Sequence, residues 1–288
     1  DLKSPAGRDL VAQLAARADV VIENFRPGVM ASFGLDAPSL AARNPGLVYV
    51  SLSGMGSTGP RGWWGSYGPT IEAASSIEHR TRYAGGPPLR LGHTLPDGVG
   101  GLAGALAVLT GLRLRAATGA GVSFDISQLE AYAALAGEDV VMVAETGAEP
   151  EWCSAGGVYR CRGEDEWVAV DGPPVRVDPS RPKEDVAAEL QARGIPAFPV
   201  LAPTELASDA HLAARGYLAR PTFDGRAVTL PASAIVANPP LVRIGARAPR
   251  FGEHTRAVVA SLGYSGREVD ALIDAGVLSA STPALSHD

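Results

Sequence analysis

Hydrophobic positions in the first half of the chain alternate between helical and strand-like spacing. Apolar residues recur every three or four positions in 4–17, and a short β-branched run follows at 20–22. A second helix and turn precede the apolar run at 47–52, and 121–145 predicts a strand that leads into a helix. Alternating helices and short apolar strands are typical of parallel sheets, so we expect a large, Rossmann-like α/β domain over 1–145.

The pattern changes near residue 150. Apolar and polar residues alternate in 156–172, which predicts a β-hairpin, and 182–201 predicts a helix followed by a strand. We therefore expect a smaller α+β domain over 150–230. Two amphipathic helices are predicted within 238–288, and we expect them to return to the large domain.

Composition and charge exclude several classes of protein. Hydrophobic residues make up 46% of the chain and charged residues 19%, which is typical of a globular enzyme. The formal net charge of -6 is spread along the chain without a basic stripe, so we expect no nucleic-acid partner. The apolar run at 99–112 is interrupted by glycine and is shorter than a membrane span, so we expect no membrane association.

Cysteine and histidine give no sign of a metal or a disulfide framework. Cys153 and Cys161 are too few for either a disulfide framework or a zinc site, and the five histidines lack the spacing of metal ligands. We expect no metal, no secretory leader and a cytoplasmic location. The chain opens on a helix rather than a strand, so we also expect a start that is missing from this sequence.

Asp97 is the one acidic residue in the glycine-rich stretch 90–121. Aspartate before an apolar helix is a preferred N-cap, and from the local sequence this is the favoured interpretation. The same place also suits a nucleophile, because a helix N-terminus stabilises an ionised carboxylate. Gly98, Gly100 and Gly101 would let a substrate approach the backbone and its N–H donors.

Two further segments are candidates for binding. The strand at 20–22 ends in a turn that contains Asn24 and Arg26, and ligands bind beyond the carboxyl ends of strands in open α/β sheets. An ordinary turn explains these residues equally well. The pair Trp63–Trp64 would either wall a pocket or cover apolar surface. His93 lies within reach of Asp97 along the chain, although a loop histidine is the simpler interpretation.

Five segments occur in a characteristic order, although each is weak by itself. They read DLKSPAGRDL, ADVVIENFRPGV, NPGLVYVSLSGMGSTGP, PDGVGGLAGALAVLTGLRLRAATGAG and RAPRFGEHTRAVV. Together they resemble the family III coenzyme A transferases, which include formyl-CoA, carnitine and aryl-succinate CoA-transferases. The similarity extends from residue 1 to about 278.

The resemblance implies a fold, a site and an activity. The fold is that of an interlocked homodimer with a large Rossmann-like domain and a small α+β domain. The resemblance implies that Asp97 is the nucleophile, whereas the local sequence favours Asp97 as a helix N-cap. The CoA-binding and lining positions that it implies are Lys3, Asn24, Phe25, Arg26, Ser66, Tyr67 and Gly68, with Gly156 and Gly157 as a loop of the small domain.

The implied reaction moves CoA from an acyl-CoA to a carboxylic acid through a covalent aspartyl intermediate, with CoA as substrate and no permanently bound cofactor. The acyl donor and the acceptor acid stay open. A heteromer with a homologous subunit is an alternative to the homodimer. The chain departs from the family pattern in lacking the first strands and in having a short 170–183 segment.

Two alternatives to a CoA-transferase activity remain. The same scaffold carries α-methylacyl-CoA racemases, whose catalytic histidine corresponds to Tyr67 here, and tyrosine is a weak acid–base partner near neutral pH. A truncated, non-catalytic subunit of a CoA-transferase complex is the other alternative.

Overall fold

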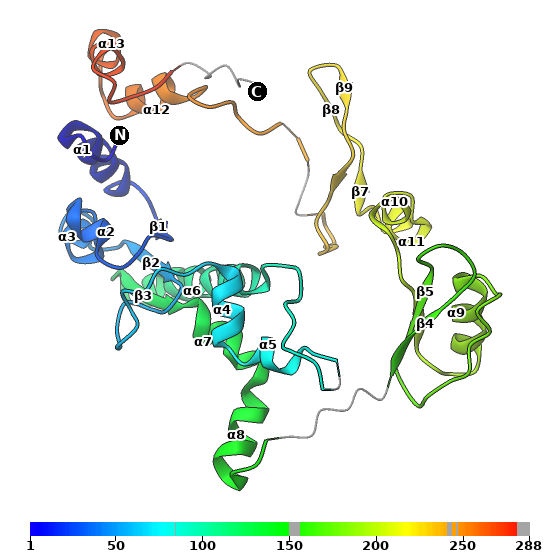
Figure 1. The fold of residues 1–288 in the computed structure, drawn as a ribbon. Helices are drawn as coiled ribbons and strands as arrows, with labels where there is room; N and C mark the ends of the chain where they lie inside the picture. Colours follow the sequence, from blue (N-terminus) through cyan, green and yellow to red (C-terminus); the bar gives the residue numbers. More distant parts are fainter. Residues whose placement is uncertain (84, 150–155, 241–243, 246, 281–288) are drawn as a thin grey trace. The chain divides into compact units, whose positions relative to one another are not determined.

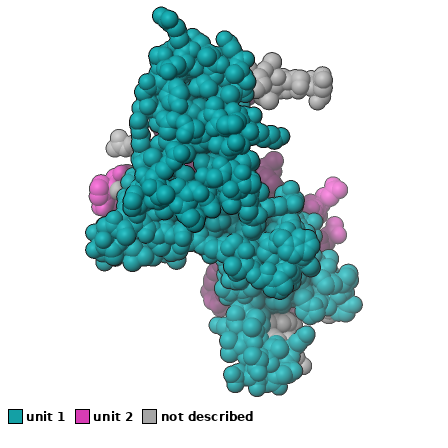
Figure 2. Space-filling model, turned by 90° about the vertical axis from the view of Figure 1, so that its left-hand side faces the viewer, with its two compact units in different colours: residues 1–150, 249–288 teal, residues 151–248 magenta. Residues whose placement is uncertain are grey.

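A computed structural model describes residues 1–83, 85–149, 156–240, 244–245 and 247–280. The chain divides into two compact units, one made of 1–150 with 249–288 and the other of 151–248 (Figure 2).

The first unit is built on a parallel sheet. Its strands are β1 (Val20–Glu23), β2 (Val48–Ser53) and β3 (Val122–Ser127), in the order β1-β2-β3 (Figure 1). Val20 pairs with Val48, and Val48 pairs with Val122. All three strands were expected from their apolar runs, and the α/β class with a parallel sheet is confirmed.

Side chains of β2 alternate between two packed layers, as the pleat of a strand requires. On one face, Tyr49 and Leu47, the residue directly before the strand, pack in a buried cluster with Ala12, Met30 and Leu40 of the N-terminal helices. These helices are α1 (Pro5–Ala15), α2 (Val29–Ser32) and α3 (Ala37–Ala41). Val48 and Val50 point the other way, toward α6 (Leu95–Thr118).

The long helix α6 packs on the sheet through small residues. Gly104, Ala107 and Gly111 are buried, and a methyl group on Gly111 would lie 2.5 Å from Val48 Cγ1. Glycine therefore permits a close helix–sheet approach at this point. The leucines of α6 lie largely on the opposite, solvent-facing side: Leu102, Leu106 and Leu109 are 73%, 67% and 66% exposed.

The expectation that the apolar run of 99–112 is too short to span a bilayer is wrong for the helix that contains it. The glycines do not interrupt α6, which has 24 residues and is long and apolar enough for a membrane span by length and composition. Its packing on β2 and β3 favours a core helix of a folded domain. The absence of membrane association stays a prediction.

The C-terminal helices pack against α1. Helices α12 (Thr255–Ser261) and α13 (Gly266–Asp274) share a buried cluster with Leu10, to which Val259 and Val269 contribute. The Gln13 amide donates to the Tyr264 hydroxyl at 2.8 Å, and the N-terminal amine of Asp1 donates to the Val277 carbonyl at 2.9 Å. These contacts join the two ends of the described chain, as Figure 1 shows for α1, α12 and α13. Both helices were expected from their amphipathic pattern.

The remaining helices of this unit lie between β2 and α6 or after β3. They are α4 (Gly68–Ala74), α5 (Ile77–Arg80), α7 (Gln128–Ala133), the 3-10 turn η1 (Ala134–Ala136) and α8 (Gly137–Thr146). The segment 121–145 was expected to hold one strand and one helix. The structure confirms the strand and divides the helix at η1.

The second unit contains an antiparallel sheet covered by one helix. Strands β4 (Gly157–Arg160) and β5 (Trp167–Val170) form the expected hairpin, and β6 (Ala197–Pro199) pairs with β5. Helix α9 (Lys183–Ala192) packs on this sheet around buried Val168 and Val186.

The rest of this unit consists of short elements. They are α10 (Pro203–Leu206), α11 (Ala210–Ala214), β7 (Leu218–Ala219), β8 (Thr222–Phe223), β9 (Arg226–Ala227) and β10 (Leu230–Pro231). Cys161 is buried in the sheet core, and burial raises the pKa of its thiol. Cys153 lies outside the described residues.

Candidate active site

The chain direction places several polar residues at one edge of the parallel sheet. Helix α6 ends at Gly119, whose positive φ of 77° turns the chain directly into β3. Because α6 packs along β2 and β3 and then reverses, its N-terminus lies at the carboxyl edge of the strands. Ligands of open α/β proteins bind at this edge.

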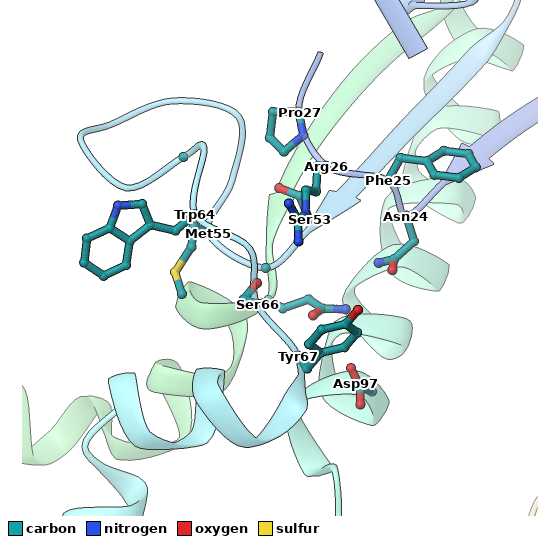
Figure 3. Close-up of a pocket in the computed structure, with 13 residues that line it drawn as sticks. Asn24, Phe25, Arg26, Pro27, Ser53, Met55, Trp64, Ser66, Tyr67 and Asp97 are labelled. Carbon is teal, nitrogen blue, oxygen red and sulfur yellow. The ribbon is translucent and has the colours of Figure 1, made fainter. Parts of the chain in front are cut away.

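A pocket of about 270 Å³ opens there. Its walls come from the ends of all three strands, from the loop after β2 and from the first turn of α6 (Figure 3). The described lining residues are Asn24, Phe25, Arg26, Pro27, Ser53, Gly54, Met55, Gly62, Trp64, Ser66, Tyr67, Asp97 and Gln128. Five of the residues expected from the resemblance, together with Asp97, are therefore brought together by the fold.

Asp97 is in the first turn of α6 but does not cap it. The helix begins at Leu95 with Thr94 as its N-cap residue and Pro96 early in the first turn, so the interpretation of Asp97 as the cap is wrong. Proline fits the start of a helix because its fixed φ and missing N–H cost nothing there. The Asp97 carboxylate is exposed and forms no hydrogen bond within the described part of the chain.

Gly68 lies directly against this carboxylate. Gly68 is buried at the start of α4, and a methyl group on it would lie 2.8 Å from Asp97 Oδ2 and 2.9 Å from Thr94 Cβ. The preceding residue, Tyr67, is 77% exposed, and its ring lies beside Asp97 in the pocket (Figure 3). Gly68 thus makes room for Asp97, while Tyr67 supplies part of the wall.

The turn after β1 is held by one hydrogen bond to β2 and one back to the end of β1. The Asn24 amide donates to the Leu52 carbonyl at 2.7 Å, and the Phe25 N–H donates to the Glu23 carboxylate at 2.7 Å. The Arg26 guanidinium packs against the backbone of Gly65. In Figure 3 the Asn24 side chain extends toward Tyr67, whereas the Phe25 ring points away from Asp97.

The loop after β2 forms another wall. Its base is held by Asp125, which accepts hydrogen bonds from the Ser57 N–H at 3.1 Å. Trp64 lines the pocket, and the Arg61 guanidinium lies 5.9 Å from the centre of its ring. Trp63 is 77% exposed and is not among the described lining residues. One member of the tryptophan pair therefore contributes to the pocket wall.

Other sequence-predicted residues are not among the described lining residues. Lys3 is exposed ahead of α1, where its carbonyl accepts a hydrogen bond from Arg8. His93 is exposed in the loop before α6. Gly156 and Gly157 belong to the second unit. The CoA-binding roles of Lys3, Gly156 and Gly157 stay predictions.

Sequence reasoning missed two polar residues of the pocket. Ser53 is the last residue of β2, and Gln128 immediately follows β3. Both are buried, with 5% and 7% exposure. The strand-end rule that singled out Asn24 would have found them if it had been applied to the second and third strands as well.

Comparison with known proteins identifies the family. Residues 1–174 match the model of CoA-transferase family III, and the chain belongs to this family. The acetyl-CoA:oxalate CoA-transferase of Acetobacter aceti is 36% identical over 151 residues, which cover 52% of this chain and 39% of that protein. The succinyl-CoA–D-citramalate CoA-transferase of Chloroflexus aurantiacus is 38% identical over 135 residues, which cover 47% of this chain and 34% of that protein.

The likeness to a solved structure extends over both units. A CAIB/BAIF family protein from Brucella suis superposes with a TM-score of 0.80 at 25% identity. The match covers 91% of this chain and 80% of that one. By contrast, the matches to the two curated relatives span less than half of each relative's length.

Proposed function

We propose that this chain acts in the transfer of coenzyme A from an acyl-CoA thioester to a carboxylic acid, with Asp97 as the nucleophile. The carrying observation is the exposed Asp97 carboxylate, which has no hydrogen bond within the described residues and lies in a pocket at the carboxyl edge of the sheet. An accessible, ionised carboxylate is a competent nucleophile. Membership of CoA-transferase family III and relatives named as CoA-transferases support this activity.

The reaction proceeds in four steps. In each step a nucleophile attacks a carbonyl carbon and a leaving group departs. An Asp97 oxygen attacks the thioester carbon, the C–S bond breaks, and a mixed anhydride and CoA thiolate form. The thiolate then attacks the Asp97 carbonyl, which releases the donor acid and leaves an aspartyl-CoA thioester. The acceptor carboxylate attacks this thioester, giving a new anhydride and thiolate. Finally, the thiolate attacks the acceptor carbonyl and frees Asp97.

Water must be kept from the anhydride and the thioester, because either would be hydrolysed. The loop that carries Trp64 lines the pocket and is tied down by Asp125, which suits it to shield these intermediates. The Tyr67 ring lies near Asp97 in Figure 3 and lines the same pocket. We assign Asn24, Phe25 and Arg26, which line the pocket in the turn after β1, to the binding of CoA.

Proton transfer at an α-carbon, as in a racemase, would need a basic partner for Asp97. The described lining residues include no histidine, and Tyr67 holds the position beside the carboxylate. A phenol is protonated near neutral pH and accepts a proton poorly. The lining therefore favours transfer.

Trapping of the intermediate tests the proposal. Hydroxylamine added during incubation with succinyl-CoA should convert an aspartyl-CoA thioester into a hydroxamate on the peptide that contains Asp97. Mass spectrometry should find this modification in the wild-type chain and not in Asp97→Asn. If the acyl donor is consumed while the Asp97 peptide stays unmodified, the covalent mechanism is wrong.

Arg26→Ala should weaken the binding of CoA esters by about tenfold. A hydrogen bond to a charged group is worth about 1.5–3 kcal/mol, and the exposure of Arg26 places its contribution at the lower end. Calorimetric titration with CoA gives the Kd, and Arg43→Ala, at an exposed arginine that is not among the described lining residues, is the matched control. Equal CoA affinity in wild type and a folded Arg26→Ala protein would contradict the assignment.

We further propose that two copies of the chain associate. The apolar stripe of Leu102, Leu106 and Leu109 along α6 is exposed, and a contiguous apolar surface of this kind is typical of an interface. Leu106→Ser should raise the dimer dissociation constant by about a hundredfold or more, because the substitution removes one leucine side chain from each copy and burying each is worth about 1.5–3 kcal/mol. Light scattering across a dilution series measures this change. A monomeric wild-type chain would contradict the proposal. A chain that forms a heteromer should associate only when a second, homologous subunit is added.

A further inference from the structure

Glu72 is a buried carboxylate close to the start of α6. It lies in α4, and only 1% of it is exposed. Its Oε1 accepts a hydrogen bond from the Leu91 N–H at 3.1 Å. Burial of a carboxylate is unfavourable unless hydrogen bonds compensate it, so its contacts in the folded protein are informative. This contact connects α4 with the segment 91–97, which leads into α6 and includes its first turn.

Gly68 and Glu72 present one face of α4 to this segment. They are four residues apart, so they are neighbours on the surface of the helix. Gly68 packs on the N-cap residue of α6 and on the nucleophile, because a methyl group on it would lie 2.9 Å from Thr94 Cβ and 2.8 Å from Asp97 Oδ2. Glu72 holds the same segment at Leu91. Helix α4 therefore contacts the segment at two places along its length.

The backbone transmits the hold on Leu91 to Asp97. Leu91 precedes Thr94 by three residues, and Thr94 is the N-cap residue of α6. The Asp97 N–H donates to the Thr94 carbonyl at 3.1 Å, which closes the first turn of the helix. Because the connection is short, a shift of the Leu91 backbone moves Thr94 and, through this hydrogen bond, the residue that carries the reacting carboxylate.

A further helix packs against Glu72. Helix α7 contacts α4 (Figure 1), and Tyr132 of α7 is 1% exposed. Burial raises the pKa of the Tyr132 phenol, and the nearby Glu72 carboxylate raises this pKa further. Glu72 is therefore enclosed by α4, α7 and the segment 91–97. An enclosed side chain has little freedom to move, which suits it to fix the backbone amide that it binds.

We infer that Glu72 is a positioning residue, which holds the Leu91 amide and thereby fixes the Asp97 carboxylate at the pocket. Glu72 is not among the described lining residues of the pocket, so it acts through the segment 91–97 rather than on the substrate. This role requires an oxygen acceptor at the place of Oε1 and does not require a negative charge. The inference rests on the proposed function, because it takes Asp97 as the reacting group.

Two substitutions at Glu72 separate the acceptor from the rest of the side chain. Glu72→Gln keeps an oxygen acceptor, so kcat for exchange of CoA between succinyl-CoA and isotopically labelled succinate should stay within about threefold of wild type. Glu72→Leu has similar size and no acceptor. The Leu91 amide should then exchange its hydrogen about tenfold faster, and kcat should fall about ten- to a hundredfold at unchanged KM for succinyl-CoA. Glu145→Leu, at an exposed glutamate of α8, is the matched control.

Two further variants separate positioning from stability. Leu91→Pro removes the donor from the other side of the contact, so its effect on kcat should not add to that of Glu72→Leu. Arg90→Pro, one residue earlier in the same loop, controls for the proline itself and should keep the wild-type kcat. Leu40→Ala leaves a cavity in the buried cluster on the face of β2 away from α6, so it should lower the melting temperature and keep kcat.

The outcomes distinguish this inference from the proposed function. Wild-type exchange of the Leu91 amide in a folded Glu72→Leu protein would overturn the inference, as would an equal loss of kcat in Leu40→Ala. The hydroxylamine experiment decides the role of Asp97 separately. A trapped Asp97 together with wild-type transfer by Glu72→Leu would contradict only the inference. Faster Leu91 exchange and lower kcat in Glu72→Leu, without trapping in the wild type, would contradict only the covalent mechanism.

Discussion

Asp97→Asn should reduce CoA transfer by about a thousandfold or more and leave the fold intact. The carboxamide is nearly isosteric with the carboxylate but does not form the anhydride on which every later exchange depends. Folding should change little, because Thr94 rather than Asp97 is the N-cap residue of α6 and the Asp97 carboxylate forms no hydrogen bond within the described residues. Loss of a negative charge in the first helical turn costs about 0.3–1 kcal/mol.

The measurement compares the melting temperature and the transfer rate in an active assembly. Asp274→Asn, the same change at the exposed last residue of α13, is the matched control and should transfer CoA at the wild-type rate. An Asp97→Asn protein that melts normally and still transfers CoA at near the wild-type rate would show that another residue is the nucleophile. A protein that melts much lower would instead assign Asp97 a structural role.

Gly68→Ala should lower transfer by about a hundredfold through displacement of Asp97. The added methyl group would lie 2.8 Å from Asp97 Oδ2, closer than van der Waals contact allows. The carboxylate is the mobile end of its side chain and can rotate away, whereas Thr94 Cβ, 2.9 Å from the added methyl group, is fixed to the backbone, so the start of α6 should shift as well. A displacement of about 1 Å at a reacting group costs about a hundredfold in rate.

Gly68→Ala should lower kcat and leave KM for the CoA ester unchanged, because the nucleophile moves while the CoA-binding turn at Asn24 and Arg26 is unchanged. Gly137→Ala is the control, since nothing lies within 4 Å of a methyl group at that helical glycine. Unchanged transfer in Gly68→Ala would mean that the close packing of Gly68 on Asp97 has no part in placing the nucleophile.

The sequence supplied most of the strands and helices near the site because each has a local signal. The apolar runs that became β1, β2 and β3 are short and bounded by turn residues, and the amphipathic pattern of the C-terminal tail marks α12 and α13. The start of α6 was misplaced, because the local sequence favours Asp97 as the cap, whereas the helix begins at Leu95 with Thr94 as its N-cap residue. Short helices such as α4 and α5 carry too few residues for a periodic signal.

The site was partly predictable for a related reason. The turn after β1 follows from the rule that ligands bind at strand ends, whereas the pairing of Asp97 with Tyr67 and Gly68 came from the family resemblance. The burial of Gln128 and Ser53 has no counterpart in the local sequence. Their exposure depends on α6 and on the loop after β2, which come from other parts of the chain.

By itself, the sequence determined the alternation of helices and parallel strands and the presence of a lone carboxylate at a helix start, because backbone periodicity and helix initiation are local properties. Only the tertiary structure decided which face of α6 is buried. Hydrophobicity favours the leucine stripe, yet the glycine and alanine face packs on the sheet, because a methyl group on Gly111 would already lie 2.5 Å from Val48 Cγ1. That close approach leaves Leu102, Leu106 and Leu109 exposed and brings Asp97 to the sheet edge beside Gln128.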